Sequence, residues 1–283
     1  MNSLPTSFVI YNRQPPQVTP CPRCAYVSAD LDRADVNVKR VIDLARNGHA
    51  QGTPEWLACR EGKITGTSLA VALHGETRFD NEFFMVNNIA LSIHNPNQCS
   101  RPTLRPISKA MQWGNDHENE ALKEFVHASG HVVMEVPFVP VESDPLHLGA
   151  SPDAITLCGT VVEIKCPYTR MIAKNGKVPP MYQAQVGLEM LATDMADFAF
   201  IEYRPRHHKQ GYLLKIVNGT FGHLDTLQTA PQLMTQKDWY KLRVKPCVDR
   251  IVKDVAVRVA FNRFMSGVSG ENMIALCGQC DDE

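Results

Sequence analysis

The order in which the hydrophobic period changes along the chain is the feature that most restricts its fold. Up to residue 130 the apolar residues recur mainly at helical spacing, whereas residues 132–166 alternate as strands do. The predicted helices cover residues 31–48, 53–60, 69–73, 109–130, 181–193 and 231–265. The predicted strands cover residues 132–141, 147–157, 160–166, 198–203 and 211–217. Helices that precede, interrupt and follow strands in this way predict one α/β or α+β domain, with a central mixed β-sheet flanked by helices.

This pattern divides the chain into three parts. Residues 1–50 predict an N-terminal arm, irregular and rich in proline as far as residue 30, with one short helix after it. Residues 51–265 predict one continuous domain, and residues 266–283 predict a tail that holds a Cys-x2-Cys pair. The N-terminus has no signal-peptide pattern, and no run reaches the ~18 apolar residues of a membrane-spanning helix, so we expect no membrane partner.

The cysteine content indicates the cellular compartment, whereas the charge does not decide whether the protein binds nucleic acid. The 29 Lys and Arg residues balance 30 Asp and Glu residues, which excludes a chain-wide cationic surface. Residues 160–250 carry 13 basic and 8 acidic side chains, an excess of five positive charges that permits nucleic-acid binding but is also common surface variation. Nine cysteines are too sparse for a secreted disulfide scaffold, so we expect a soluble, intracellular protein in a reducing compartment.

The candidate chemistry lies in two adjacent predicted strands. Gly149-Ala-Ser-Pro-Asp153 is followed, after nine residues, by Glu163-Ile164-Lys165. A hairpin that turns at Cys158-Gly159 would bring Asp153 near Glu163. Strand alternation places Glu163 and Lys165 on the same face.

Two carboxylates beside an ammonium group are suited to phosphodiester hydrolysis. Carboxylate oxygens bind Mg²⁺ or Mn²⁺, which polarise a phosphodiester and lower the pKa of a bound water. A nearby lysine can orient that water or stabilise the charge that develops on the phosphorane. The alternative is a surface hairpin with a Glu163–Lys165 ion pair, and this short pattern alone does not decide between the two.

Further motifs occur in order around this pair. They are Trp56-x3-Arg60-x-Gly-x-Ile-Thr-x-Thr67, Trp113-Gly-x3-Glu118-Asn-x-Ala, Gly149-Ala-Ser-Pro-Asp153 with Glu163-Ile-Lys165-Cys-Pro, and Ala184-Gln185-Val186 in a predicted helix. Together they resemble the PD-(D/E)XK nucleases, in the branch of phage lambda exonuclease and the YqaJ-type viral recombinases. The resemblance spans about half of the chain, and it implies a restriction-endonuclease-like core and a nuclease domain over residues 51–265.

The resemblance implies a metal site that binds Mg²⁺, with Mn²⁺ as a substitute. Asp153 and Glu163 would be the central ligands, together with the carbonyl oxygen of Ile164. Glu118 would complete the site or bind a second ion.

The remaining motif residues have implied roles around that metal. Lys165 would position the attacking water, and Gln185 would support the site or its lysine. Arg60 would hold a phosphate group of the DNA. Thr67 stands where the family commonly has serine, and its hydroxyl could also contact phosphate; Ser68 is the alternative for this role.

The activity implied is that of a Mg²⁺-dependent deoxyribonuclease. Such an exonuclease degrades linear double-stranded DNA from a 5′ end and leaves 3′ single-stranded tails for recombination or viral DNA processing. Two alternatives stay open, a broad-specificity DNA/RNA endonuclease of the same fold and a catalytically inactive nucleic-acid-binding module. By analogy the partners would be a single-strand annealing protein and further copies of the chain in a trimer, and a viral source would place the protein in the host cytoplasm or nucleus.

Two cysteine pairs near the chain ends suggest a second metal site. Cys21-x2-Cys24 and Cys277-x2-Cys280 could together close a tetrahedral zinc site if the termini meet. Some related nucleases join the ends of the domain with an iron–sulfur cluster, but they use one N-terminal and three C-terminal cysteines, so this resemblance is imperfect. The alternative is two unrelated ends with free thiols. Cys158 has no partner by spacing and is interpreted as structural.

Overall fold

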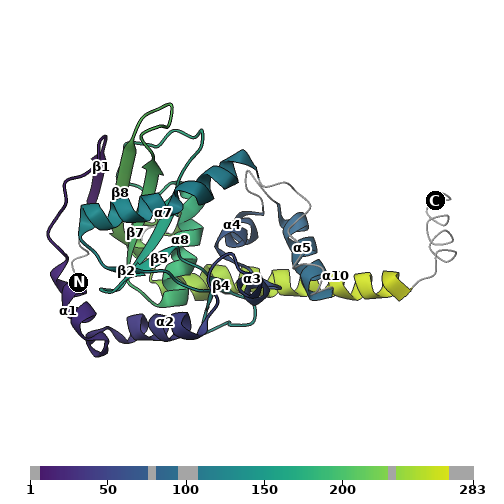
Figure 1. The fold of residues 1–283 in the computed structure, drawn as a ribbon. Coiled ribbons are helices and arrows are strands. Elements are labelled where there is room, and N and C mark those ends of the chain that lie inside the picture. Colours follow the sequence, from purple (N-terminus) through teal and green to yellow (C-terminus); the bar gives the residue numbers. More distant parts are fainter. Residues whose placement is uncertain (1–6, 76–80, 95–107, 229–233, 268–283) are drawn as a thin grey trace.

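The computed structural model describes residues 7–75, 81–94, 108–228 and 234–267. Within these ranges six strands form one mixed sheet (Figure 1). Their order across the sheet is β1 (Ser7–Tyr11), β8 (Leu213–Thr220), β7 (Asp197–Arg204), β6 (Thr160–Lys165), β5 (Ala154–Thr156) and β2 (Val133–Met134). Only β6 and β7 run parallel among these neighbours, and β3 (Val139–Pro140) pairs with β4 (Gly149–Ala150) outside the sheet.

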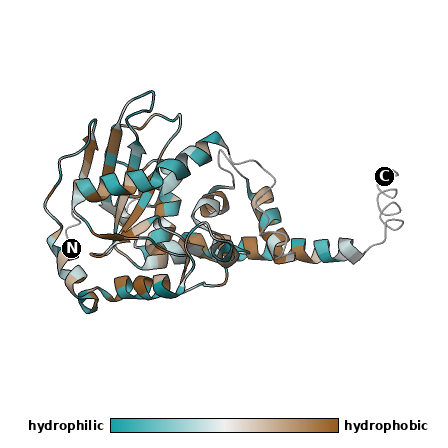
Figure 2. Ribbon diagram, in the orientation of Figure 1, coloured by the Kyte–Doolittle hydropathy of each residue, from teal (hydrophilic) through white to brown (hydrophobic). Residues whose placement is uncertain are grey.

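Helices cover both faces of the sheet, as the sequence predicts. On one face α7 (Lys109–Ser129) packs Ala121 and Phe125 against Val162 and Ile164 of β6. On the other face α8 (Pro180–Thr193) packs against Val161, so alternate residues of β6 point to opposite helices. Figure 2 shows that the central strands are largely hydrophobic, whereas α7 also carries a hydrophilic surface.

The remaining elements surround this core. They are α1 (Pro22–Ala29), a 3₁₀ turn (Leu31–Arg33), α2 (Val36–Asn47), α3 (Pro54–Arg60), α4 (Gly66–His74), α5 (Glu82–His94), 3₁₀ turns at Phe221–His223 and Asp225–Leu227, α9 (Gln236–Trp239), a π-helical turn (Tyr240–Val244) and α10 (Lys245–Gly267). None of the helices within the described ranges is long and apolar enough to cross a membrane.

Capping by nearby residues explains where α3 begins and where α7 begins and ends. Thr53 accepts a hydrogen bond from the backbone N–H of Trp56, and Pro54 occupies the first turn of α3. Ser108 caps α7 in the same way, and Gly130 ends this helix in the left-handed conformation, with φ of 68°.

The structure contradicts several predictions about secondary structure. Residues 7–11 are not irregular, because β1 pairs antiparallel with β8 and extends the sheet. Residues 22–29, also predicted to be irregular, form the helix α1. The predicted strands over 132–141 and 147–157 are each broken into two short ones. Pro137 and Pro152 lie at the breaks, where a residue without an N–H cannot continue a ladder.

Candidate active site

The β5–β6 hairpin brings the predicted carboxylates together. Ala154 pairs with Val162, and the chain turns through Gly159, whose φ of 91° suits glycine. Asp153 Oδ2 accepts a hydrogen bond from the backbone N–H of Ile164 at 2.6 Å. Asp153 therefore lies against the strand segment that carries Glu163, as the hairpin prediction requires.

Glu163 is buried and its two oxygens have different surroundings. Its Oε1 atom contacts Lys165 Nζ in an ion pair and accepts a hydrogen bond from Gln185 Nε2 at 2.6 Å. Its Oε2 atom is buried and has no hydrogen-bond partner among the described residues. Since Glu163 is only 1% exposed, the alternative of a solvated surface ion pair is excluded. A buried carboxylate oxygen without a donor is well placed to bind a cation.

A further carboxylate, which the sequence motifs did not indicate, joins this group. Glu189 lies one turn beyond Gln185 on α8, and its Oε1 accepts a hydrogen bond from Gln185 Nε2 at 2.9 Å. Its Oε2, like that of Glu163, is buried without a partner in the described part of the chain. The four-residue spacing from Gln185, in a helix that is otherwise largely apolar there, is the signal that could have identified it.

The site gathers more carboxyl groups than its single lysine could balance if all of them were ionised. Burial, followed by the charge of Glu163, raises the pKa of Asp153 and of Glu189 well above their ordinary values. The same two causes raise the pKa of Glu118 on α7. Four carboxyl groups thus face one ammonium group, and a divalent cation would offset this imbalance.

A small cavity opens beside these carboxylates. It has a volume of about 180 Å³ and is lined by Gln51, Glu118, Asn119, Leu122, Glu135, Asp153 and Ile164. Glu118 and Asp153, from α7 and the hairpin, face the same space. This volume accommodates several water molecules, as Mg²⁺ requires because it keeps part of its hydration shell.

Two lining residues of this cavity were missed by the sequence reasoning. Gln51 Nε2 donates to the carbonyl oxygens of Val136 and Pro152, both at 2.8 Å, and so fixes the backbone just before Asp153. Glu135 adds a further carboxylate to the rim. Neither residue belongs to a local pattern, so only the fold identifies them.

Arg60 and its neighbours lie on α3, close to the same hairpin. The Arg60 guanidinium is 4.1 Å from the ring centre of Trp56, and Trp56 Nε1 donates to Ser151 Oγ at 3.1 Å. Burial lowers the pKa of Arg60. No residue in the described ranges accepts a hydrogen bond from its guanidinium, so its donors are free to bind an anion.

The start of α4 lies next to Gln185. A Cβ atom on Gly66 would lie 2.7 Å from Gln185 Cγ, so this close approach requires glycine. Ser68 Oγ accepts a hydrogen bond from the Thr65 N–H at 2.7 Å and therefore caps the helix. Thr67 is exposed, and within the described ranges its hydroxyl has no partner. Of the two alternatives for phosphate contact, Thr67 has the freer hydroxyl.

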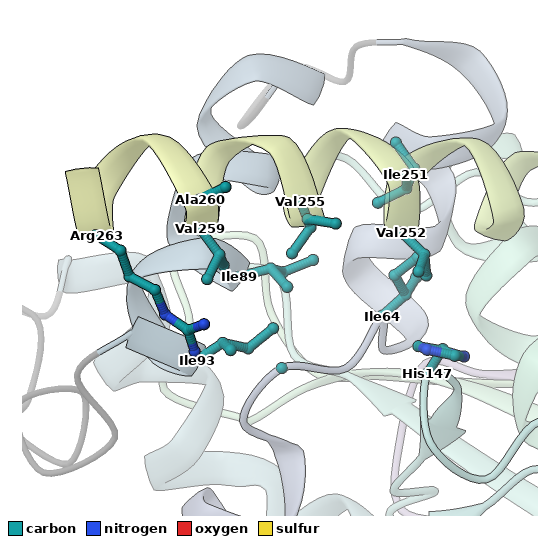
Figure 3. A pocket seen from close by; sticks show the side chains of 12 residues that line it. Ile64, Ile89, Ile93, His147, Ile251, Val252, Val255, Val259, Ala260 and Arg263 are labelled. Atoms are coloured by element: carbon teal, nitrogen blue, oxygen red, sulfur yellow. The ribbon is translucent and has the colours of Figure 1, made fainter. Parts of the chain in front are cut away.

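A second cavity, between α5 and α10, has a different character (Figure 3). It has a volume of about 360 Å³, and Ile89, Ile93 and Val255 are among its aliphatic lining residues. Its polar side chains are His147 and Arg263, and no carboxylate lines it. This cavity therefore lacks the carboxylates that would bind a catalytic Mg²⁺.

Comparison with known proteins identifies the family and supports the fold. A family model described as the YqaJ-like viral recombinase domain matches residues 55–196, which is half of the chain. The crystal structure of an alkaline exonuclease, LHK-Exo from Laribacter hongkongensis, has a TM-score of 0.57 and 22% sequence identity over 76% of this chain and 98% of that chain. The structure of LHK-Exo in complex with dAMP has the same TM-score and coverage at 20% identity.

More distant comparisons add no further argument. A phage-related exonuclease from Haemophilus somnus 129PT has 14% identity and a TM-score of 0.39 over 73% of this chain and 96% of that chain. No curated protein is significantly similar to the sequence. The match to LHK-Exo confirms the expected fold, a mixed sheet flanked by helices. The chain belongs to the YqaJ-like viral recombinase family, as the order of its motifs predicts.

Proposed function

We propose that the protein is a Mg²⁺-dependent exonuclease that degrades linear double-stranded DNA from its 5′ ends. The observation that carries this proposal is the buried group of carboxylates around Lys165, in which Glu163 Oε2 has no partner among the described residues. Family membership and the exonuclease fold support the same reaction class.

The residues of the site fit a divalent cation. Asp153, Glu163, Glu118 and the carbonyl oxygen of Ile164 would hold Mg²⁺, or Mn²⁺ in its place, because hard oxygen donors suit both ions. When bound, the ion would polarise the scissile phosphodiester and favour deprotonation of a water molecule. Gln185 and Lys165 hold the Oε1 atom of Glu163, and Oε2, which has no partner among the described residues, would be available to the ion.

The DNA end would be bound by α3 and the start of α4. Arg60 offers a planar set of donors that matches phosphate, and Thr67 adds a hydroxyl beside the site. The structural relative LHK-Exo has been crystallised with dAMP, a deoxynucleoside monophosphate of the kind that exonucleolytic cleavage of DNA releases. We assign Arg60 and Thr67 to the terminal 5′-phosphate.

The biological role that follows is the production of 3′ single-stranded tails for recombination or viral DNA processing. Residues 51–265 would form the nuclease domain, and a single-strand annealing protein would bind the tails. Assembly of further copies into a trimer would enclose the duplex and make degradation processive.

The test uses linear duplex DNA labelled at either end, with 5′-phosphate or 5′-hydroxyl termini and Mg²⁺. We expect loss from the 5′ end, faster with phosphate, and no cleavage by Lys165→Ala, which should still fold and bind DNA. Arg60→Lys should cleave but lose at least about tenfold of the phosphate preference, because lysine lacks the planar fork. Cleavage indifferent to the ends, or of RNA, would support the endonuclease alternative. DNA binding without cleavage by the unmodified protein in the presence of Mg²⁺ would support the inactive binding module.

A further inference from the structure

We propose that Cys21, Cys24, His131 and Cys158 form a structural zinc site that fastens the N-terminal segment to the catalytic hairpin. One ligand atom from each of these four side chains lies within 4.8 Å of every other. Three thiolates and one imidazole are a ligand set that closes a tetrahedral zinc site. This site is separate from the proposed catalytic metal and does not depend on it.

The distances suit one ion at the centre of the group. His131 Nδ1 lies 3.4 Å from Cys24 Sγ and 3.5 Å from Cys158 Sγ. Zinc bonds of about 2.3 Å to sulfur and about 2.0–2.1 Å to nitrogen, at tetrahedral angles, place such atoms roughly 3.5 Å apart. In an iron–sulfur cluster the four ligands are divided among two or more iron atoms, whereas four ligand atoms that all lie within 4.8 Å of one another favour a single ion.

The four ligands come from three segments that are distant in sequence. Cys21 and Cys24 lie at the start of α1, His131 follows α7, and Cys158 occupies the β5–β6 turn. Backbone contacts already hold these segments together. The Cys21 N–H donates to the Gly130 carbonyl oxygen at 2.8 Å, and the Leu157 N–H donates to the Val132 carbonyl oxygen at 3.0 Å.

The packing around the four ligands allows the N-terminal segment to pass close to Gly130. Gly130 has a φ of 68°, and a Cβ atom there would lie 2.4 Å from the Thr19 carbonyl oxygen, so glycine permits the N-terminal segment to pass. Cys24 is fully buried, and the His131 ring stacks on Phe125 with centroids 6.0 Å apart. The histidine is thus oriented toward the thiols by a core residue.

The position of the site gives it a structural role in the proposed reaction. Cys158 lies in the turn between Asp153 and Glu163, the two central carboxylates. Zinc at this turn would fix the hairpin against α1 and α7, and α7 also carries Glu118. Loss of zinc should therefore loosen the geometry of the carboxylates without removing any of them.

The first measurement is the zinc content of the full chain, purified without chelator under reducing conditions. We expect one zinc ion per chain by mass spectrometry of the metal. Cys24→Ser should lower this value to near zero, whereas Cys59→Ser, an exposed cysteine on α3, should keep it. The double substitution Cys277→Ser/Cys280→Ser should also keep the zinc, because the site is complete without the tail.

Cobalt binding can be measured on the unmodified chain. This measurement therefore does not require a variant that still folds after it has lost its metal. Co²⁺ bound in place of zinc should give thiolate-to-cobalt absorption bands in the unmodified chain. His131→Cys should still bind the ion, with bands shifted by a fourth thiolate. DNA cleavage plays no part in either measurement, so failure of the zinc site is distinguishable from failure of the proposed nuclease.

Three results would overturn the inference. The first is a protein without zinc, even after refolding with zinc under reduction. The second is retention of zinc by Cys24→Ser, and the third is loss of zinc on substitution of the tail cysteines alone.

Discussion

Substitution of Gly66 by alanine tests whether the start of α4 holds Gln185 in position. The new Cβ atom would lie 2.7 Å from Gln185 Cγ, whereas nonbonded carbons settle about 3.5–4.0 Å apart. The glutamine must therefore move by roughly 1 Å. Its Nε2 atom donates to Glu163 Oε1 at 2.6 Å, and a shift of roughly that size takes this hydrogen bond beyond its useful range.

The expected effect falls on catalysis more than on stability. Misplacement of a catalytic group by about 1 Å costs on the order of 100-fold in rate, or about 2.7 kcal/mol in activation free energy. Alanine is a better helix former than glycine by up to about 1 kcal/mol, and overpacking costs about 1–3 kcal/mol, so the two effects on folding oppose each other. We expect the free energy of unfolding of Gly66→Ala to change by less than about 2 kcal/mol.

A double-mutant cycle with Gln185→Ala provides the decisive assay. Exonuclease rates on labelled duplex DNA and urea unfolding curves would be measured for both single variants and the double variant. Because alanine at position 185 has no Cγ, Gly66→Ala should cause little further loss of rate in that background. An equal loss in both backgrounds, or a Gly66→Ala enzyme with unchanged rate, would refute the reasoning.

Two further predictions concern the charges of the site. In metal-free protein the raised pKa of Glu189 means that the folded state holds this proton more tightly than the unfolded state, so stability is lost as pH rises from about 4.5 through the raised pKa. Glu189→Gln should remove that loss of stability, which is worth about 1.4 kcal/mol per unit of pKa shift. Unfolding curves at pH 5 and pH 8 should then show a flatter pH dependence of the unfolding free energy. A pH dependence equal to that of the unmodified protein would contradict the prediction. Added Mg²⁺ should raise the unfolding free energy by about 2.7 kcal/mol at 100 times its Kd, and a similar rise in Asp153→Asn would place the ion elsewhere.

The parts of the fold that local sequence controls could be predicted. Thr53, Ser108 and Gly130 mark helix ends through contacts within a few residues, and Gly159 marks the hairpin turn. Strand β1 was missed because its partner β8 is about 200 residues away, where Ser7 pairs with Asn218. Its outward side chains at the sheet edge also weaken the alternation that identifies a strand.

The pair Cys21 and Cys24 shows that local sequence also cannot identify all the ligands of a metal site. Cys21-x2-Cys24 indicates half of a metal site by its spacing alone, but spacing cannot identify the other half. The structure brings His131 and Cys158 to this pair. Cys277 and Cys280, the partners expected from the sequence, lie outside the described residues. Cys158, interpreted as an isolated structural cysteine, gains its partners only when the β5–β6 turn meets α1.

The environment of Lys165 constrains its part in the proposed reaction. Burial alone would lower the pKa of this amine, but the Glu163 and Asp153 carboxylates outweigh burial and raise the pKa above its ordinary value. In the metal-free protein these carboxylates therefore favour the protonated form of Lys165, which suits a hydrogen-bond donor better than a base for the attacking water. Its contribution is to donate hydrogen bonds and to stabilise negative charge on the phosphate. Lys165→Gln should retain a hydrogen-bond donor yet lose most of the activity, whereas activity that recovers in Lys165→Gln at high pH would indicate that the charge is not what the site uses.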